Sequence, residues 1–219
     1  MLGRWRAPTI SGQIENLYKV QKKDIPQAGA VLADAFQHDS VWRRFFRSEA
    51  KIDQKGILFE APIRYCFKYG EVYATSEHLE GIAAWVPGDL ADMTIWRLIR
   101  SGAIISGLKA MRVCTRLAWK QGRIFEPLKA DRKANMKGRA YIYLMIIGVA
   151  SEFQGQGFGG KFLRALIEES EQVGIPIYVE TATERNVRMY ERLGFKQLGQ
   201  ITLPVINLPH WEMIREPRT

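Results

Sequence analysis

A short glycine-rich segment in the last third of the chain has the composition of an anion-binding loop. Residues 154–160 read QGQGFGG, between an apolar run at 141–149 and an amphipathic stretch at 161–173 that ends before Gly174. The pattern predicts a buried strand, a loop and then a helix. The N–H groups at a helix N-terminus are unpaired and carry partial positive charge, and glycines allow a phosphate to approach them.

Two general phosphate-binding patterns fit this segment incompletely. Residues 155–161 match the spacing G-x-x-x-x-G-K of a nucleoside triphosphate loop, but Phe162 stands where a Ser or Thr should bind magnesium. The glycines also fit the dinucleotide pattern G-x-G-x-x-G, with Glu180 about 20 residues further on. That fold requires its first glycine directly after the strand and a long series of βα units. Here residues 150–154 intervene, and only 39 residues follow Glu180.

A third pattern, Q-x-x-G-x-G, is formed by Gln154, Gly157 and Gly159 within residues 147–159, IGVASEFQGQGFG. A second motif, ERNVRMYERLGF at 184–195, contains N-x-x-x-Y-E-x-x-G-F. Together, in this order and separated by a helix and a strand, the two motifs resemble the GNAT superfamily of N-acetyltransferases. The resemblance covers residues 141–195 and extends more weakly to 28–46 and to 208–215.

The resemblance implies an α/β fold with helices on both faces of a central sheet. That sheet would be mixed and mostly antiparallel, and splayed at a bulge. It also implies acetyl-CoA as cosubstrate, with no metal. Backbone groups of the central strand would bind pantetheine and the acetyl oxygen, and the loop amides would bind the diphosphate. The residues expected to contact the cosubstrate are Ile147, Gly148, Val149, Gln154, Gly155, Gln156, Gly157, Phe158, Gly159, Gly160, Asn186 and Tyr190.

The expected chemistry is direct transfer of an acetyl group to an amine of a small molecule. Tyr190 is the predicted general acid, because a phenol can protonate a thiolate leaving group; packing beside Phe195 is its alternative role. Asn186 is expected to cap its helix, with pantetheine binding as a second possible role. Residues 141–149 contain no carboxylate, so Glu180 is the candidate general base, or else an ion-paired acid.

Other side chains could border the acceptor site. His38 and Asp39 lie between the first expected helices, and Tyr73 and Trp85 lie on an expected β-hairpin at 70–76 and 79–86. Core packing is the alternative for the two aromatic residues. Ser151 departs from the proline found in many GNAT members, which should loosen the turn without removing its N–H donors. The branch that the chain most resembles contains puromycin acetyltransferase.

Length and composition favour a single domain. Of the 219 residues, 47% are hydrophobic, enough for a core. We expect a flexible arm at 1–16 and one acetyltransferase domain at 17–219. Two cysteines and no signal-like apolar start favour a cytoplasmic protein, monomeric or homodimeric. The longest apolar stretch, 95–111, is interrupted by three basic residues and is not expected to span a membrane.

Positive charge concentrates in one part of the chain. Residues 101–140 contain ten Lys or Arg and two acids, a net charge of +8 out of the total of +9. Residues 92–140 are interpreted as a basic helical insertion, with two helices interrupted near Gly102 and a basic stripe through Lys109, Arg112, Arg116 and Lys120. Its apolar residues should pack against the domain's own sheet, although an anionic membrane surface is an alternative.

Three hypotheses about function follow from these patterns. The first is the small-molecule N-acetyltransferase described above. The second is a regulatory protein that binds CoA without turnover, because the central strand contains no carboxylate. The third is an acetyltransferase that modifies an amine of a protein or of a nucleic-acid complex through the basic segment. Direct nucleic-acid binding is not expected, because no basic-aromatic pattern of an RNA-binding module is present.

Overall fold

The computed structural model describes residues 12–218, apart from the side chains of residues 52, 53 and 119. Within this range, seven strands form one sheet in the order β1-β2-β3-β4-β5-β7-β6. All neighbours are antiparallel except β4 and β5, which are parallel. The strands are Tyr18–Lys19 (β1), Glu71–Ala74 (β2), Gly81–Pro87 (β3), Ile142–Val149 (β4), Ile177–Thr181 (β5), Lys196–Leu203 (β6) and Leu208–Arg215 (β7).

Helices cover both faces of the sheet, which confirms the predicted fold class. The helices are Ile25–Ala35 (α1), Trp42–Phe45 (α2), Ile52–Tyr69 (α3), Ile95–Ser101 (α4), Ala103–Ala110 (α5), Gln121–Asn135 (α6), Phe158–Val173 (α7) and Glu184–Arg192 (α8). Short 3-10 turns lie at Gln13–Asn16 (η1), Lys22–Asp24 (η2), Gly88–Leu90 (η3), Arg116–Lys120 (η4) and Ser151–Phe153 (η5). Among the described residues, no helix is both long and apolar enough to cross a bilayer.

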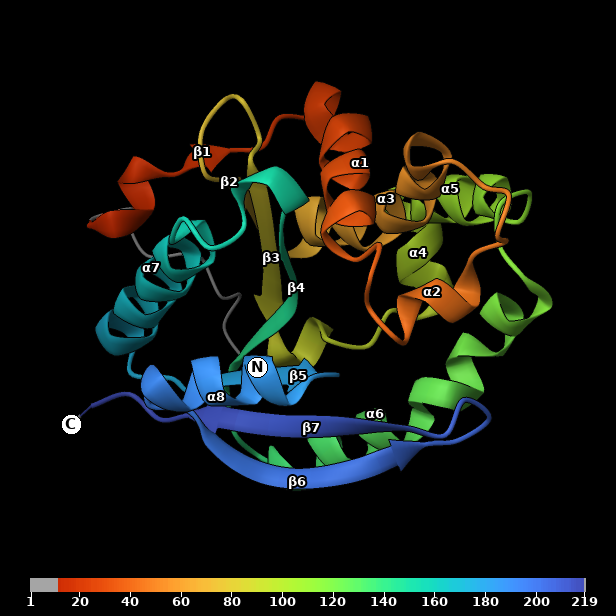
Figure 1. The fold of residues 1–219 in the computed structure, drawn as a ribbon. Coiled ribbons are helices and arrows are strands. Elements are labelled where there is room, and N and C mark those ends of the chain that lie inside the picture. Colours follow the sequence, from red (N-terminus) through yellow and green to blue (C-terminus); the bar gives the residue numbers. More distant parts are fainter. Residues whose placement is uncertain (1–11, 219) are drawn as a thin grey trace.

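Alternation along the strands divides the core into two main clusters. Val72 and Ala74 face α1 and α3, whereas Tyr73 between them faces α7. In β5, Val179 points toward α7 and α8, and Tyr178 points toward the end of α6. The helices α1, α3 and α6 therefore cover one face, and α7 and α8 cover the other. The sheet twists strongly, so that β3 and β4 run across the direction of β6 and β7 (Figure 1).

The centre of the sheet is interrupted at β4. The register between β3 and β4 shifts at Ala84 and Trp85, where Met145 is the extra residue of a β-bulge. On its other edge, β4 pairs with β5 only at its start, and the last pair is Leu144 with Val179. Beyond this pair the two strands diverge, as the resemblance predicted. The predicted hairpin is also confirmed, as β2 and β3.

The basic segment differs from the sequence prediction in two respects. Gly102, in a left-handed conformation with φ 74°, separates α4 from α5 as expected, but α5 ends at Ala110. The four cations of the predicted stripe are therefore distributed over α5, a turn and η4, and do not lie along one helix. In addition, α5 packs on α3 and not on the sheet. Ser106 bonds to Glu60 and Arg64 of α3, which holds α5 there, and residues 113–115 then bond to residues 45–47.

The arm predicted at residues 1–16 is only partly within the described range. Residues 1–11 lie outside it. Of the remainder, η1 lies against α7, and the backbone N–H of Gln13 donates to Oε2 of Glu168 at 3.0 Å. The division of the chain into an arm, a domain and an insertion stays a prediction.

Candidate active site

The glycine loop presents a row of free backbone amides. Gly155 and Gly157 have φ values of 82° and 88°, in the left-handed region, and a Cβ at either position would meet no atom within 4 Å. Their conformation, and not crowding, therefore requires glycine. Among the described residues, no protein acceptor receives an N–H from residues 155–160. Because Phe158, Gly159 and Gly160 form the first turn of α7, these amides can hold an anion.

Side chains at both ends of the loop fix its position. Gln154 donates through Nε2 to the carbonyl of Val149 at 3.0 Å, and Gln156 does the same to the carbonyl of Glu152 at 3.1 Å. Lys161, one turn into α7, reaches the carbonyl of Thr75 at 3.1 Å. The glutamine of the sequence motif therefore joins the loop to the end of β4.

Ser151, where many proteins of the resembled family have proline, has a specific structural role. Its N–H donates to Oδ2 of Asp34 at 2.5 Å, and its hydroxyl bonds to Oδ1 at 3.1 Å. Asp34 comes from the last turn of α1, so this pair joins the first helix to the turn before the loop. A proline could not donate the first bond. The sequence predicts a looser turn here, whereas these two bonds tie the turn to α1, and the N–H of Ser151 is kept as a donor.

The free edge of β4 carries a second, separate set of amides beside the gap. The N–H of Ala150 donates to the carbonyl of Glu80, on the β3 side. Because successive N–H groups of a strand point to opposite edges, those of Ile147 and Val149 point to the side where β5 has diverged. The amide of Gly148 points to β3. A Cβ on Gly148 would lie 2.9 Å from Leu32 and from Ala35, so close packing of α1 explains this glycine.

Tyr190 approaches the gap from the α8 face. Its side chain is 2% exposed and packs on Phe195 with ring centroids 5.1 Å apart. Val179 and Met213 belong to the same cluster of buried residues. Burial raises the pKa of the phenol well above its usual range. A phenol is already protonated at neutral pH, so burial keeps Tyr190 neutral and also makes it a weaker acid.

Asn186 does not cap its helix, contrary to the sequence prediction. The cap is Thr183, whose hydroxyl accepts from the N–H of Asn186 at 3.3 Å. Asn186 is in the first turn of α8, and its side-chain amide donates to the hydroxyl of Thr181 at 3.1 Å. Threonine caps a helix as asparagine does, and here the cap is Thr183, so α8 begins at Glu184. Asn186 thus joins the helix to the end of β5.

Glu180 lies in β5 and points to the opposite face from Tyr190. Nη1 of Arg132 donates to its Oε1 at 2.8 Å, and the hydroxyl of Tyr143 donates to its Oε2 at 2.9 Å. Arg132 also bonds to Oδ1 of Asp92 at 3.0 Å. Burial raises the pKa of Glu180, and the charge of Arg132 opposes that rise. Glu180 is thus an ion-paired acid, and it lies where the two central strands diverge.

The neighbouring strand carries a second buried carboxyl group. Glu212 in β7 is opposite Glu180 in the β5–β7 register, and the hydroxyl of Tyr178 donates to its Oε1 at 2.9 Å. Burial raises the pKa of Glu212 to about 7. Two buried acids, both with raised pKa values and one of them paired with Arg132, therefore lie side by side.

The other side chains considered from sequence have separate positions. Tyr73 and Trp85 stack with ring centroids 5.2 Å apart in the buried core under α7, which is the packing alternative. Asp39 accepts the N–H groups of Val41 and Trp42, at 2.9 and 3.0 Å, at the start of α2. His38 is exposed.

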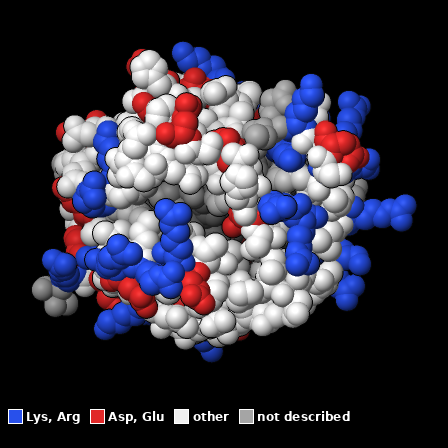
Figure 2. Space-filling model, in the orientation of Figure 1, with Lys and Arg blue, Asp and Glu red and all other residues white. Residues whose placement is uncertain are grey.

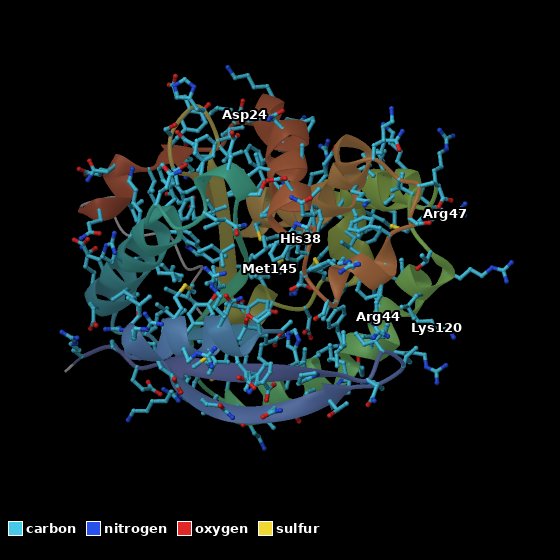
Figure 3. The ribbon with its side chains drawn as sticks, viewed as in Figure 1. Asp24, His38, Arg44, Arg47, Lys120 and Met145 are labelled. Carbon is cyan, nitrogen blue, oxygen red and sulfur yellow. The ribbon has the colours of Figure 1, made fainter. Side chains whose placement is uncertain are left out.

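Figure 2 shows that this face of the molecule is hollowed in the middle, with lysine and arginine side chains around the hollow. Comparison with Figure 1 puts the hollow over β4. The labelled His38 and Met145 lie in the same part of the view (Figure 3). An open groove of about 1100 Å³ lies elsewhere, near the ends of α7 and α8, and none of the predicted site residues lines it.

Sequence reasoning missed three members of the Glu180 group: Asp92, Arg132 and Tyr143. Asp92 and Arg132 are 48 or more residues from Glu180 along the chain, and Arg132 belongs to a run of similar cations. No local pattern distinguishes Arg132 from its neighbours. Tyr143 gave a detectable signal, because a phenol in an otherwise apolar buried strand requires a hydrogen-bond partner.

Comparisons with known proteins agree with this geometry. Residues 117–195 match the model of the acetyltransferase (GNAT) family. An uncharacterised N-acetyltransferase of Schizosaccharomyces pombe is 30% identical over 225 residues, covering 92% of this chain and 83% of the yeast protein. A mycothiol acetyltransferase of Propionibacterium freudenreichii is 41% identical over 69 residues, 30% of this chain and 21% of that protein.

Solved structures share the fold at low sequence identity. One is a Corynebacterium glutamicum protein described as histone acetyltransferase HPA2 and related acetyltransferase. It has a TM-score of 0.63 at 20% identity, and the match covers 93% of this chain and 97% of that chain. A polyamine N-acetyltransferase of Drosophila melanogaster has a TM-score of 0.54 at 10% identity, with 91% and 98% covered. The chain spans most of the yeast relative, and it belongs to the GNAT family of acetyltransferases.

Proposed function

We propose that this acetyltransferase transfers the acetyl group of acetyl-CoA directly to an amine of a small molecule, in a ternary complex without a covalent enzyme intermediate. The observation that carries the proposal is two sets of unpaired amides, separated by residues 150–154, of which at least Ala150, Ser151, Phe153 and Gln154 have bonded N–H groups. The first set is Ile147 and Val149 at the free edge of β4, and the second is residues 155–160 at the start of α7. Donors of this kind suit a ligand with carbonyl oxygens at one end and phosphates at the other.

Each group has a role that its surroundings favour. The amides of residues 155–160 would hold the diphosphate, with the side chains of Gln154, Gln156 and Phe158 beside it. Ile147 and Val149 would donate to pantetheine and to the acetyl oxygen, where one buried donor contributes about 3–4 kcal/mol to transition-state stabilisation. Asn186 would bind pantetheine from its position in the first turn of α8. The amide of Gly148 faces β3 and cannot bond to the cosubstrate. Gly148 would therefore contact the cosubstrate only through its Cα.

Tyr190 is the proposed general acid. When bound, acetyl-CoA supplies an activated thioester. As the amine nitrogen bonds to the carbonyl carbon, the carbon–sulfur bond breaks and the departing thiolate needs a proton. Tyr190 is protonated, lies on the α8 side of the gap and forms no hydrogen bond to another described residue. Its hydroxyl is therefore available to donate.

Glu180 is the proposed general base, directly or through a water molecule. It lies on the α6 side of the gap, opposite Tyr190, which separates proton uptake from proton delivery. Its raised pKa makes it a better proton acceptor than an exposed glutamate. Arg132 and Tyr143 occupy one bond direction of each carboxylate oxygen and would orient the group.

We also propose a branch of the family, a cellular location and an oligomeric state for this chain. The chain would be nearest to the branch containing puromycin acetyltransferase, act in the cytoplasm, and work as a monomer or homodimer. Residues 208–215, to which the family resemblance extends, form β7 and supply Glu212. A protein-bound amine as acceptor is less favoured, because the cations of residues 101–140 that would attract an acidic protein are partly used internally, Arg132 above all.

A regulator that binds CoA without turnover is the second candidate. The bonds from Arg132 and Tyr143 favour it, since both oxygens of Glu180 already have a protein donor. Steady-state assays with acetyl-CoA and a panel of small amines separate the two candidates. Formation of free CoA that depends on the amine and is lost in Tyr190→Phe supports the enzyme. Tight CoA binding by calorimetry, with no turnover on any amine, supports the regulator.

A further inference from the structure

Helix α5 presents its large apolar residues to solvent and its small residues to the core. Ala103, Ser106 and Ala110 are 1–2% exposed against α3, whereas Ile105 and Leu108 are 58% and 59% exposed. A surface helix of a globular protein normally has the opposite arrangement. The exposed side of α5 is therefore apolar without a partner in the described part of the chain.

Helix α4 extends the same surface. Ile95 is 73% exposed and Trp96 is 63% exposed, and α4 has no buried residue. Ten large hydrophobic side chains are exposed in the described residues, and seven of them lie between positions 93 and 111. We call these seven the apolar patch: Met93, Ile95, Trp96, Ile99, Ile105, Leu108 and Met111. Such a concentration marks an interaction surface.

The patch is held on a firm support. The hydroxyl of Ser106 donates to Oε2 of Glu60 at 2.9 Å and accepts from Nε of Arg64 at 3.0 Å, which fastens α5 to α3. Beyond α5, the N–H of Arg47 donates to the carbonyl of Val113 at 3.0 Å. The apolar side chains are thus exposed by a fixed arrangement, at the edge of the molecule opposite α7 (Figure 1).

Positive charge dominates residues 93–125, which carry the patch, and Asp92 directly precedes them. Residues 93–125 contain seven Lys or Arg and no acid. Arg100 lies over the ring of Trp96, with 5.4 Å between its guanidinium carbon and the ring centroid, and Lys109 and Arg112 are exposed beside Leu108 and Met111. Figure 3 labels Arg44, Arg47 and Lys120 on the same side of the molecule. A partner for this surface must be both apolar and anionic.

We propose that α4 and α5 bind the surface of an anionic lipid bilayer, with the apolar patch inserted among the lipid headgroups and the cations near lipid phosphates and carboxylates. The combination of Trp, Ile and Leu with Lys and Arg is that of an interfacial helix. With seven and eight residues, the two helices are too short to cross a bilayer. A second copy of the chain fits poorly, because a self-complementary interface would bring cations against cations.

Vesicle co-sedimentation of the full chain tests this proposal. We expect binding to vesicles of phosphatidylcholine mixed with phosphatidylserine, and at least about tenfold weaker binding to phosphatidylcholine alone or in high salt. The double variant Trp96→Gln/Leu108→Gln should lose binding by about tenfold or more. Its matched control is Leu198→Gln/Val205→Gln, which removes two exposed apolar residues from other places and should bind normally.

A charge series separates electrostatic attraction to this surface from net charge. Arg100→Gln/Lys109→Gln/Arg112→Gln should weaken binding, while Lys22→Gln/Lys23→Gln/Lys196→Gln, with the same loss of three exposed charges, should not. Circular dichroism of each variant checks the fold. Absence of binding to anionic vesicles, or equal loss in patch variants and controls, overturns the proposal. So does gel filtration showing a dimer that Trp96→Gln/Leu108→Gln dissociates.

Discussion

Two regions of this acetyltransferase expose what proteins usually bury, and they do so in opposite ways. The unit from β4 to α8 buries its side chains and leaves backbone amides unpaired, at residues 155–160 and at the free edge of β4. The helices α4 and α5 instead leave large apolar side chains in solvent. Unpaired amides suit a small polar ligand with defined geometry, whereas an apolar and cationic surface suits a large, deformable partner.

The largest expected effect is at the loop. Gly157→Glu combines a side chain at φ 88° with a negative charge at the proposed diphosphate site, and should weaken CoA binding by at least about 1,000-fold, or about 4 kcal/mol. Gly138→Glu is the matched control, because Gly138 has φ 74° and an equally open Cβ direction far from the loop. Calorimetry in which both variants bind CoA equally well would refute the loop assignment.

Tyr190→Phe should lower kcat by about 100-fold or more, with CoA affinity nearly unchanged, since the ring that packs on Phe195 is retained and only the proton donor is lost. Tyr65→Phe removes another buried hydroxyl, which donates to the carbonyl of Leu90 at 2.7 Å, and should leave kcat within about twofold of wild type. If Tyr190→Phe turns over normally, Tyr190 is only a packing residue.

For helix α5, we expect substitutions to change stability and not catalysis. Ala103→Leu would place a large residue against α3 and should lower the free energy of unfolding by about 2 kcal/mol. Leu108→Gln, on the exposed side of the same helix, should change it by less than about 0.5 kcal/mol. Urea titration measures both. Equal destabilisation by the two substitutions would mean that Leu108 is covered in solution.

The smallest effect is expected at Glu180. Glu180→Gln should reduce kcat by about tenfold near neutral pH. In the wild type, kcat should fall as pH drops through the raised pKa of Glu180, because the base becomes protonated, and the variant should lack this acid limb. Glu212→Gln removes the neighbouring carboxyl group, one strand from the gap, and serves as control. An unchanged acid limb in Glu180→Gln would assign the base elsewhere.

The sequence predicted the first region far better than the second. Glycines at 155 and 157 are required by local backbone conformation, so their spacing is visible in the chain itself. The cap of α8 was misplaced by three residues because Thr183 and Asn186 are both good caps. The Arg132–Glu180 pair joins residues 48 apart, which no local pattern encodes.

The orientation of α5 could not be predicted for a related reason. Residues 103–110, AIISGLKA, are apolar around most of the helix, so periodicity does not say which side is buried. The choice is made by α3, where Glu60 and Arg64 select the side carrying Ser106. The pattern predicted packing against the sheet, and the observed arrangement leaves Ile105 and Leu108 exposed.

The most direct test of the loop assignment compares amide NMR shifts of the ¹⁵N-labelled protein on addition of CoA and of pantetheine, which lacks the diphosphate. If the amides of residues 155–160 bind the diphosphate, CoA shifts them and pantetheine does not, while both ligands shift Ile147 and Val149. Loop amides that stay unmoved by CoA, or that respond equally to pantetheine, would contradict the assignment.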